Sequence, residues 1–266
     1  MHRIFITVIA TAFTTQAAAG VVLETVERDP AAGTQAGTNV LRADDGRLRM
    51  ERYEAGKLIA VMLFKDDALY ALDPAEKTYA VLDRETIDRV AKVVNPALKE
   101  LQEQLARMSP EQRAMVEQMM QGSLPSGLGD GEKKVREVVT TDRKDRIAGV
   151  ACTVVEIRED SERVREACVA PADSVPGGQD FYDVLSRMGA LMQDMLDSID
   201  APWLKESVDD TWSTVKELDG VPVRAIEYEQ GKPVLEVVLT RIAEEPAPAD
   251  SFEVPEGYTR RDLDAL

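Results

Sequence analysis

The sequence predicts an α+β protein built on one large, strongly curved antiparallel sheet, an incomplete β-barrel with helices packed on its concave face. Short strand-like segments bounded by turn residues fill residues 20–83 and return over 133–170 and 211–242. Helical periodicity is confined to two blocks, 84–121 and 181–199. Single strands and single helices therefore do not alternate as they do in parallel sheets. A sheet of so many strands has to curve.

The first block of strands reads as a meander. Its predicted strands are residues 21–26, 39–42, 47–53, 57–64, 68–72 and 78–82. Asp44-Asp45-Gly46 is a compact turn between the second and third strands. Residues 57–64 are apolar on both faces, so the sequence requires a cover on each side of that strand.

A Met-rich helical insert follows at about 84–121. Asp83 is a candidate cap for a first helix, and Pro96 is expected to interrupt the pattern before a second helix begins. Ser109-Pro110-Glu111-Gln112 has the composition of a capping box that starts a third short helix. The apolar positions of the insert are Ile87, Val90, Val94, Leu98, Leu101, Leu105, Met108, Met115, Met119 and Met120. The Gly-rich residues 122–131 then predict a flexible connector.

Strands resume after the connector. The predicted strands are residues 133–141, 147–158, 163–170, 211–218, 221–228 and 234–242, with an extended tail at 251–258. Between them one amphipathic helix places apolar residues at three- and four-residue spacing. These residues are Phe181, Leu185, Met188, Met192, Met195 and Ile199.

Cys152 and Cys168 are the only cysteines, and a hairpin turn at Glu159-Asp160-Ser161 lies midway between them. Folding the chain about Asp160 puts the two cysteines opposite each other on one face, so we expect a disulfide. It would stabilise the fold by about 3 kcal/mol in the chain-entropy treatment. A redox-active pair is the alternative, but the C-x-x-C spacing is missing.

The first residues predict a secretory signal peptide at 1–19. Arg3 is followed by an apolar run and by Ala17-Ala18-Ala19, with cleavage expected near Ala19/Gly20. The run is too short to span a bilayer, and no later segment is a transmembrane candidate. A buried N-terminal strand or helix is the alternative. If the signal peptide is removed, residues 20–266 are expected to form a single periplasmic domain.

Charge and composition exclude several functions. A net charge of -17 and a pI near 4.6 disfavour nucleic-acid binding. The single histidine, His2, lies in the segment expected to be removed, which leaves no imidazole for a catalytic triad or a metal. Enzymatic chemistry based only on carboxylates, lysine or tyrosine stays open. We expect a non-catalytic protein with no cofactor and no metal.

The methionines suggest what the protein binds. Thioether side chains adapt to ligands of variable shape, so the helices could line an apolar cavity. Its predicted residues are Met115, Met119, Phe181, Leu185, Met188, Met192 and Met195. The alternatives are an ordinary filled core in an interaction module of the cell envelope, and Cu(I) binding through the methionines.

Several short motifs resemble a family of secreted bacterial proteins with a domain of unknown function, similar in layout to the periplasmic lipoprotein carriers LolA and LolB. They are the strand pair at 43–50, Leu72-Asp73-Pro74 with Lys77-Thr78-Tyr79, and the closing residues 252–258. The resemblance implies a curved, incomplete barrel closed by helices, an interior that holds acyl chains, and a Gram-negative periplasm. It assigns no catalytic residue. The expected ligand is lipid-like, and an envelope protein partner is the alternative.

Overall fold

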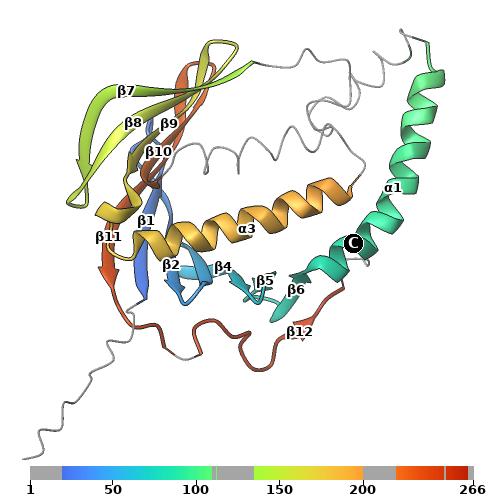
Figure 1. Ribbon diagram of the computed structural model, residues 1–266, viewed down its shortest axis with the longest axis horizontal. Helices are drawn as coiled ribbons and strands as arrows, with labels where there is room; N and C mark the ends of the chain where they lie inside the picture. Colours follow the sequence, from blue (N-terminus) through green and yellow to red (C-terminus); the bar gives the residue numbers. More distant parts are fainter. Residues whose placement is uncertain (1–19, 110–111, 113–134, 200–219, 249, 263–266) are drawn as a thin grey trace, which may run out of the picture.

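The computed structural model describes residues 20–109, 112, 135–199, 220–248 and 250–262. Their strands form one 12-stranded sheet in the order β12-β6-β5-β4-β3-β2-β1-β11-β10-β9-β8-β7 (Figure 1). The strands are β1 (Val21–Arg28), β2 (Gln35–Asp44), β3 (Arg47–Glu54), β4 (Lys57–Lys65), β5 (Ala68–Asp73), β6 (Thr78–Leu82), β7 (Arg136–Ile147), β8 (Val150–Glu159), β9 (Glu162–Ala170), β10 (Val221–Glu229), β11 (Lys232–Glu244) and β12 (Thr259–Arg260). The helices are α1 (Arg84–Arg107), the 3-10 turn η1 (Ala172–Ser174) and α3 (Gly178–Ser198).

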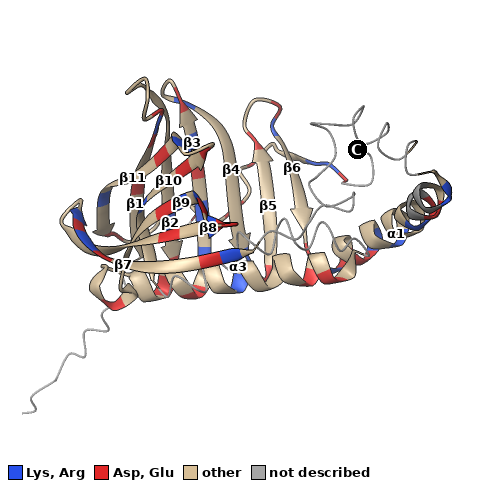
Figure 2. Cartoon of the chain, turned by 90° about the horizontal axis from the view of Figure 1, so that it is seen from above, with Lys and Arg blue, Asp and Glu red and all other residues tan. Residues whose placement is uncertain are grey.

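The sheet consists of two antiparallel meanders, β1 to β6 and β7 to β11, which join where β1 pairs with β11. Only β12 is parallel to its neighbour, β6. The sheet curls so that β7 and β8 turn back over the face that α3 covers (Figures 1 and 2). An ion pair between Arg224 of β10 and Asp145 of β7 bridges two intervening strands at 3.9 Å. The predicted α+β fold with a large curved sheet is confirmed.

The sequence correctly predicted the turns at Asp45 and Gly46 and at Gln230 and Gly231, but the turn at Ala148 and Gly149 lies inside a predicted strand, 147–158. Asp45 and Gly46 both have positive φ angles, of 50° and 70°, as do Gln230 and Gly231. Two residues in this conformation make the turn whose twist matches that of the flanking strands. Short turns of this kind fix the register of each hairpin and so decide which side chains face inward.

The face of the sheet that α3 covers, called the inner face below, carries the main core. Buried side chains from both meanders meet α3 there: Val21, Leu23, Ala43, Leu48, Phe64, Val150, Cys152, Val154, Cys168, Ala170, Val221, Val223 and Leu239 from the sheet, and Phe181, Val184, Met188 and Leu191 from α3. One helix thus holds the two meanders together through apolar burial.

Strand β4 is covered on both sides, as its double apolar pattern predicted. Phe64 points into the main core, whereas Val61 and Leu63 belong to a second cluster with Leu72. The side chains of Val254 and Tyr258, from the segment that runs between β11 and β12, pack against this second cluster. The C-terminal segment therefore covers the outer face.

Pro96 does not interrupt the helical insert, because α1 runs through it from Arg84 to Arg107. A proline in a helix removes one backbone hydrogen bond and bends the helix, and α1 bends along its length (Figure 1). Asn95 donates from Nδ2 to the carbonyl of Ser198 at 3.0 Å, which secures this stretch to the end of α3. Two of the three predicted helices are therefore one.

The predicted caps are confirmed. The Oδ1 atom of Asp83 accepts a hydrogen bond from the amide of Thr86 at 2.8 Å. Ser109 and Gln112 form the reciprocal pair of a capping box, with distances of 3.0 and 3.2 Å.

Strand β7 is longer than predicted. It continues to Ile147 through an irregularity between Thr140 and Lys144, and Ala148 and Gly149 turn the chain into β8. The sequence pattern did not predict a strand at 142–146 because these residues are charged and show no apolar alternation. An exposed edge strand does not need that alternation, and its charges protect it from pairing with other chains.

Other predictions lie outside the described residues: the signal peptide, Met115, Met119, the connector at 122–131 and the strand at 211–218. None of the helices in the described ranges is long and apolar enough to cross a membrane.

Candidate functional site

Cys152 and Cys168 form the predicted disulfide, with their Cα atoms 5.4 Å apart. They share one face of the sheet but are not directly opposite, because Cys168 pairs with Val154. The two-residue turn at Asp160 and Ser161, together with a register shift between Ile157 and Arg158, moves β9 along β8 relative to a fold about Asp160. The bond therefore runs diagonally within the core beneath α3.

Four of the five predicted ligand residues of α3 contact the main core. Phe181 and Met188 are 5% and 3% exposed and belong to the main core. Leu185 and Met195 pack partly against that core, and Met192 is half-buried. The binding role of these residues stays a prediction.

Sequence reasoning missed Val184 and Leu191, which are buried on α3. Both lie three residues after a predicted position, Phe181 and Met188, whereas the predicted stripe took the residue four positions on each time. Spacing of 3.6 residues per turn makes either choice compatible with one stripe. The apolar side chains of the β-branched Val184 and the bulky Leu191 were the signals that could have identified these two positions as buried.

Polar contacts from the middle and from the C-terminal part of α3 hold the helix over the inner face. Arg187 donates to the carbonyl of Gly46 at 3.2 Å and to Asp67 at 2.7 Å. It therefore contacts the turn between β2 and β3 and the turn between β4 and β5. Near the C-terminal end of α3, Asp194 pairs with Arg84 of α1. These contacts hold α3 in a defined position against the inner face of the sheet.

A continuous apolar row crosses the inner face next to the residues that α3 buries. The register pairs its members strand by strand from β2 to β6: Leu41, Met50, Met62, Ala71 and Ala80. We call these five residues the inner row. Ala71 is exposed and the other four are half-buried. Among the described residues, the inner row is therefore apolar surface that α3 leaves partly open.

The next row toward the opposite end of these strands is polar. Glu27 is only 8% exposed and accepts hydrogen bonds from Arg52 at 2.8 Å and from Asn39 at 3.0 Å. The inner face thus changes from apolar to charged along the strands.

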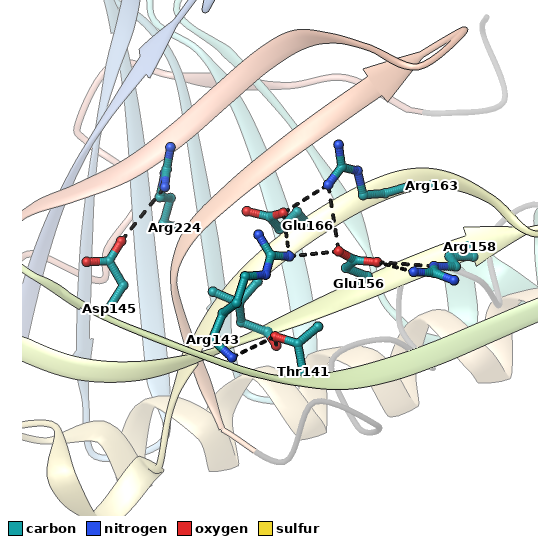
Figure 3. Close-up of polar contacts among 9 residues, drawn as sticks. Thr141, Arg143, Asp145, Glu156, Arg158, Arg163, Glu166 and Arg224 are labelled. Carbon is teal, nitrogen blue, oxygen red and sulfur yellow. Dashed lines mark hydrogen bonds and ion pairs between the residues drawn. The ribbon is translucent and has the colours of Figure 1, made fainter.

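The same change occurs in the second meander, beyond the disulfide. Glu156 of β8 and Glu166 of β9 lie directly opposite each other on the face that carries the cysteines. Arg143 of β7 donates to both, at 2.7 and 2.9 Å, and Arg158 and Arg163 approach from the hairpin end (Figure 3). We call these five residues the Arg–Glu cluster.

The cluster favours the ionised form of Glu156. The hydrogen bond from Arg158 lowers the pKa of Glu156 below its ordinary value of 4.5, against the opposing effect of burial. The hydrogen bond to Glu166 raises the already high pKa of Arg143. Two facing carboxylates without cations would share a proton. Here Arg143, Arg158 and Arg163 place positive charge beside the two carboxylates.

A comparable arrangement lies on the outer face of β3. Burial alone would raise the pKa of Glu51, but hydrogen bonds from Arg42 and Arg49 outweigh it and the pKa is lowered. Burial and the neighbouring Glu51 raise the pKa of Tyr53. These residues support the sheet away from the inner face.

Comparison with known proteins gives no family. No family model matches the chain, and no relative was found among the curated proteins. One similar solved structure is an uncharacterized conserved protein from Thermus thermophilus, with a TM-score of 0.41, 8% identity, and coverage of 92% of this chain and 91% of that one.

Two further solved structures are longer than this chain. PNGF-II gives a TM-score of 0.41 at 9% identity, with 93% of this chain covering 32% of that one. The MucA/MucB complex of Pseudomonas aeruginosa gives a TM-score of 0.36 at 9% identity, with 90% of this chain covering 56% of that one. At these values the similarity is a loose one in the path of the chain.

Proposed function

We propose that this is a non-catalytic binding protein of the periplasm, which holds a lipid or another apolar ligand against the inner face of its curved sheet. The observation that carries the proposal is the inner row. Its apolar side chains lie on the inner side of a curved sheet, beside a helix that is fixed in place, and one of them, Ala71, is exposed. Apolar surface left open on a concave face is typical of a ligand site.

The composition of the inner row suits a flexible apolar ligand. Met50 and Met62 adjoin each other across β3 and β4, and Ala71 and Ala80 follow on β5 and β6. Thioether side chains change shape at little cost, and alanines leave room above the sheet. An acyl chain lying across the strands would contact all four. The layout-level resemblance to LolA and LolB supports the same class of ligand.

The disulfide supports a location outside the cytoplasm, because such bonds persist in oxidising compartments. The signal-peptide pattern at 1–19 points the same way. The absence of histidine from residues 20–266 and the neutralised pair Glu156 and Glu166 support a role in binding rather than in catalysis.

One observation favours the second candidate, an interaction module of the envelope with a filled core. Phe181 and Met188, both predicted to contact ligand, are buried among side chains of the protein itself. In that case α3 organises the fold and a protein partner is the ligand. Copper binding has only the sequence spacing of Met188, Met192 and Met195 in its favour.

The deciding experiment places a large side chain in the inner row. Ala71→Trp should weaken the binding of a neutral, environment-sensitive fluorescent probe about tenfold or more, since a steric clash of about 1.4 kcal/mol changes affinity tenfold. Ala151→Trp is the matched control, because Ala151 is also exposed in a strand but points away from the inner face. Native mass spectrometry of residues 20–266 should show a bound lipid mass. Equal probe affinity in both variants, with a clean protein mass, would favour the interaction module.

A further inference from the structure

The hairpin of β8 and β9 pairs like charges at three positions, one of which is Glu159 opposite Glu162 beside the turn. At the other two, Glu156 is opposite Glu166, and Arg158 is opposite Arg163. Like charges directly opposite each other destabilise a sheet, and exchanging one glutamate with one arginine would remove the latter two repulsions. The sequence instead gathers its cations at one place on the inner face, where Arg143 joins them (Figure 3).

The buried carboxylates hold the arginines in position. The side chains of Glu156 and Glu166 are 11% exposed, whereas those of Arg143, Arg158 and Arg163 are 50%, 39% and 37% exposed. The guanidinium of Arg163 also lies over the ring of Tyr228, 4.0 Å from its centre. The two carboxylates and the ring of Tyr228 therefore hold the three guanidinium groups in place, and part of each arginine side chain stays exposed to solvent.

We propose that Arg143, Arg158 and Arg163 form a binding site for a phosphate group, the anionic head of the ligand whose apolar part lies on the inner face. This inference rests on the proposed function. Three cations against two carboxylates leave the Arg–Glu cluster with one positive charge. Planar guanidinium groups, which donate in pairs, suit phosphate oxygens better than any other side chain.

The surroundings set limits on the affinity. Glu137 of β7 is opposite Arg158 and exposed, and the whole chain carries a charge of -17. Attraction at long range is therefore absent, and recognition depends on contact with the guanidinium groups. Salt should weaken such partly exposed contacts.

The test compares full-length mature protein binding to vesicles of phosphatidylglycerol, to vesicles of phosphatidylcholine and to inorganic phosphate. The wild type should prefer phosphatidylglycerol. The double variant Arg158→Gln/Arg163→Gln should lose about tenfold in that affinity, as expected for two lost ion-pair contacts that are partly exposed to solvent. Arg165→Gln/Arg241→Gln removes the same charge from the opposite face and should bind as the wild type does.

Glu137→Gln provides a second variant that leaves every contact of the Arg–Glu cluster in place, and it should strengthen binding. Competition by inorganic phosphate would identify a site for the free anion, whereas binding to vesicles alone would identify a lipid head group. Equal binding to both vesicle types, no effect of phosphate and no effect of Glu137→Gln would overturn the inference. Binding of the neutral probe is measured in parallel. A wild type that does not bind this probe would overturn the proposed function instead.

Discussion

Arg143 of β7 donates to Glu156 of β8 and also to Glu166 of β9, two carboxylates that face each other across adjacent strands. A single guanidinium thus links three consecutive strands at the edge of the sheet. Because β7 is the last strand, this link closes the curl of the second meander. Its strength depends on the ionisation of Glu156, whose pKa is lowered.

Acidification should weaken the second meander through Glu156. The folded-state pKa of Glu156 is lowered, mainly by the hydrogen bond from Arg158. A lowered pKa contributes stability that is present above the ordinary value of 4.5 and is lost as pH falls through the folded-state value. Glu156→Gln should lower the free energy of unfolding at pH 7 by about 1–3 kcal/mol, because it leaves guanidinium groups without a charged partner.

Urea unfolding of wild type and Glu156→Gln at a series of pH values from neutral to strongly acidic checks this prediction. The two curves should converge as pH falls below 4.5 and through the lowered folded-state pKa of Glu156. A constant difference at all pH values would show that packing, and not charge, causes the loss.

Removing the disulfide should destabilise the protein without changing its fold. The two cysteines are 16 residues apart in sequence, and a loop of this size gives about 3 kcal/mol in the chain-entropy treatment. The double variant Cys152→Ala/Cys168→Ala should unfold at correspondingly lower urea concentration with an unchanged circular dichroism spectrum. Thiol labelling of the unfolded, unreduced wild type should find no free thiol; two labelled cysteines would refute the pairing.

Much of the sheet could be predicted because local signals decide it. The turn at Asp45 and Gly46 and the strand Thr78–Leu82 followed directly from residue type and alternation. The cover on both sides of β4 also followed, since apolar residues on both faces have to be buried. The disulfide was predicted, but not its diagonal course, because nothing in the residues near Ile157 announces a register shift.

The misses have a common physical origin in tertiary context. Contacts with α3 accompany the continuation of α1 through Pro96, and the position of β7 at the sheet edge allows its charged residues. The inner row was missed because alanines and paired methionines on different strands become one surface only once the register is known. The Arg–Glu cluster was missed for the same reason, since its five residues come from three strands and meet only through the register.

The contact between Arg187 and Gly46 should make one glycine turn more sensitive than another. Gly46 and Gly56 both have positive φ, of 70° and 77°, so alanine strains the backbone at each. A Cβ atom at Gly46 would lie 2.6 Å from Nη1 of Arg187, whereas the space around Gly56 is open. Gly46→Ala should therefore cost about 0.5–1.5 kcal/mol more than Gly56→Ala, the value of the displaced hydrogen bond.

A double-mutant cycle with Arg187→Ala, followed by thermal unfolding, checks this assignment. The difference between the two glycine variants should vanish in the Arg187→Ala background. If it persists, the turn itself and not its contact with α3 is responsible.

Phe252 should be the main anchor of the C-terminal segment on the outer face. Its side chain is 1% exposed, and the guanidinium of Arg47 lies 4.6 Å from the centre of its ring. Phe252→Ala should lower the free energy of unfolding by about 3–5 kcal/mol, because it removes a fully buried ring and leaves a cavity. Glu253→Gln is the matched control: Glu253 is more than half exposed and pairs with Lys65, so its loss should cost less than about 1 kcal/mol. Hydrogen exchange in Phe252→Ala should also become faster at two backbone amides of this segment. The amide of Thr259 donates to the carbonyl of Lys77 at 2.9 Å, and the amide of Arg261 donates to the carbonyl of Tyr79 at 2.7 Å. Unchanged protection at these two amides in Phe252→Ala would show that pairing with β6, rather than the buried ring, holds the segment in place.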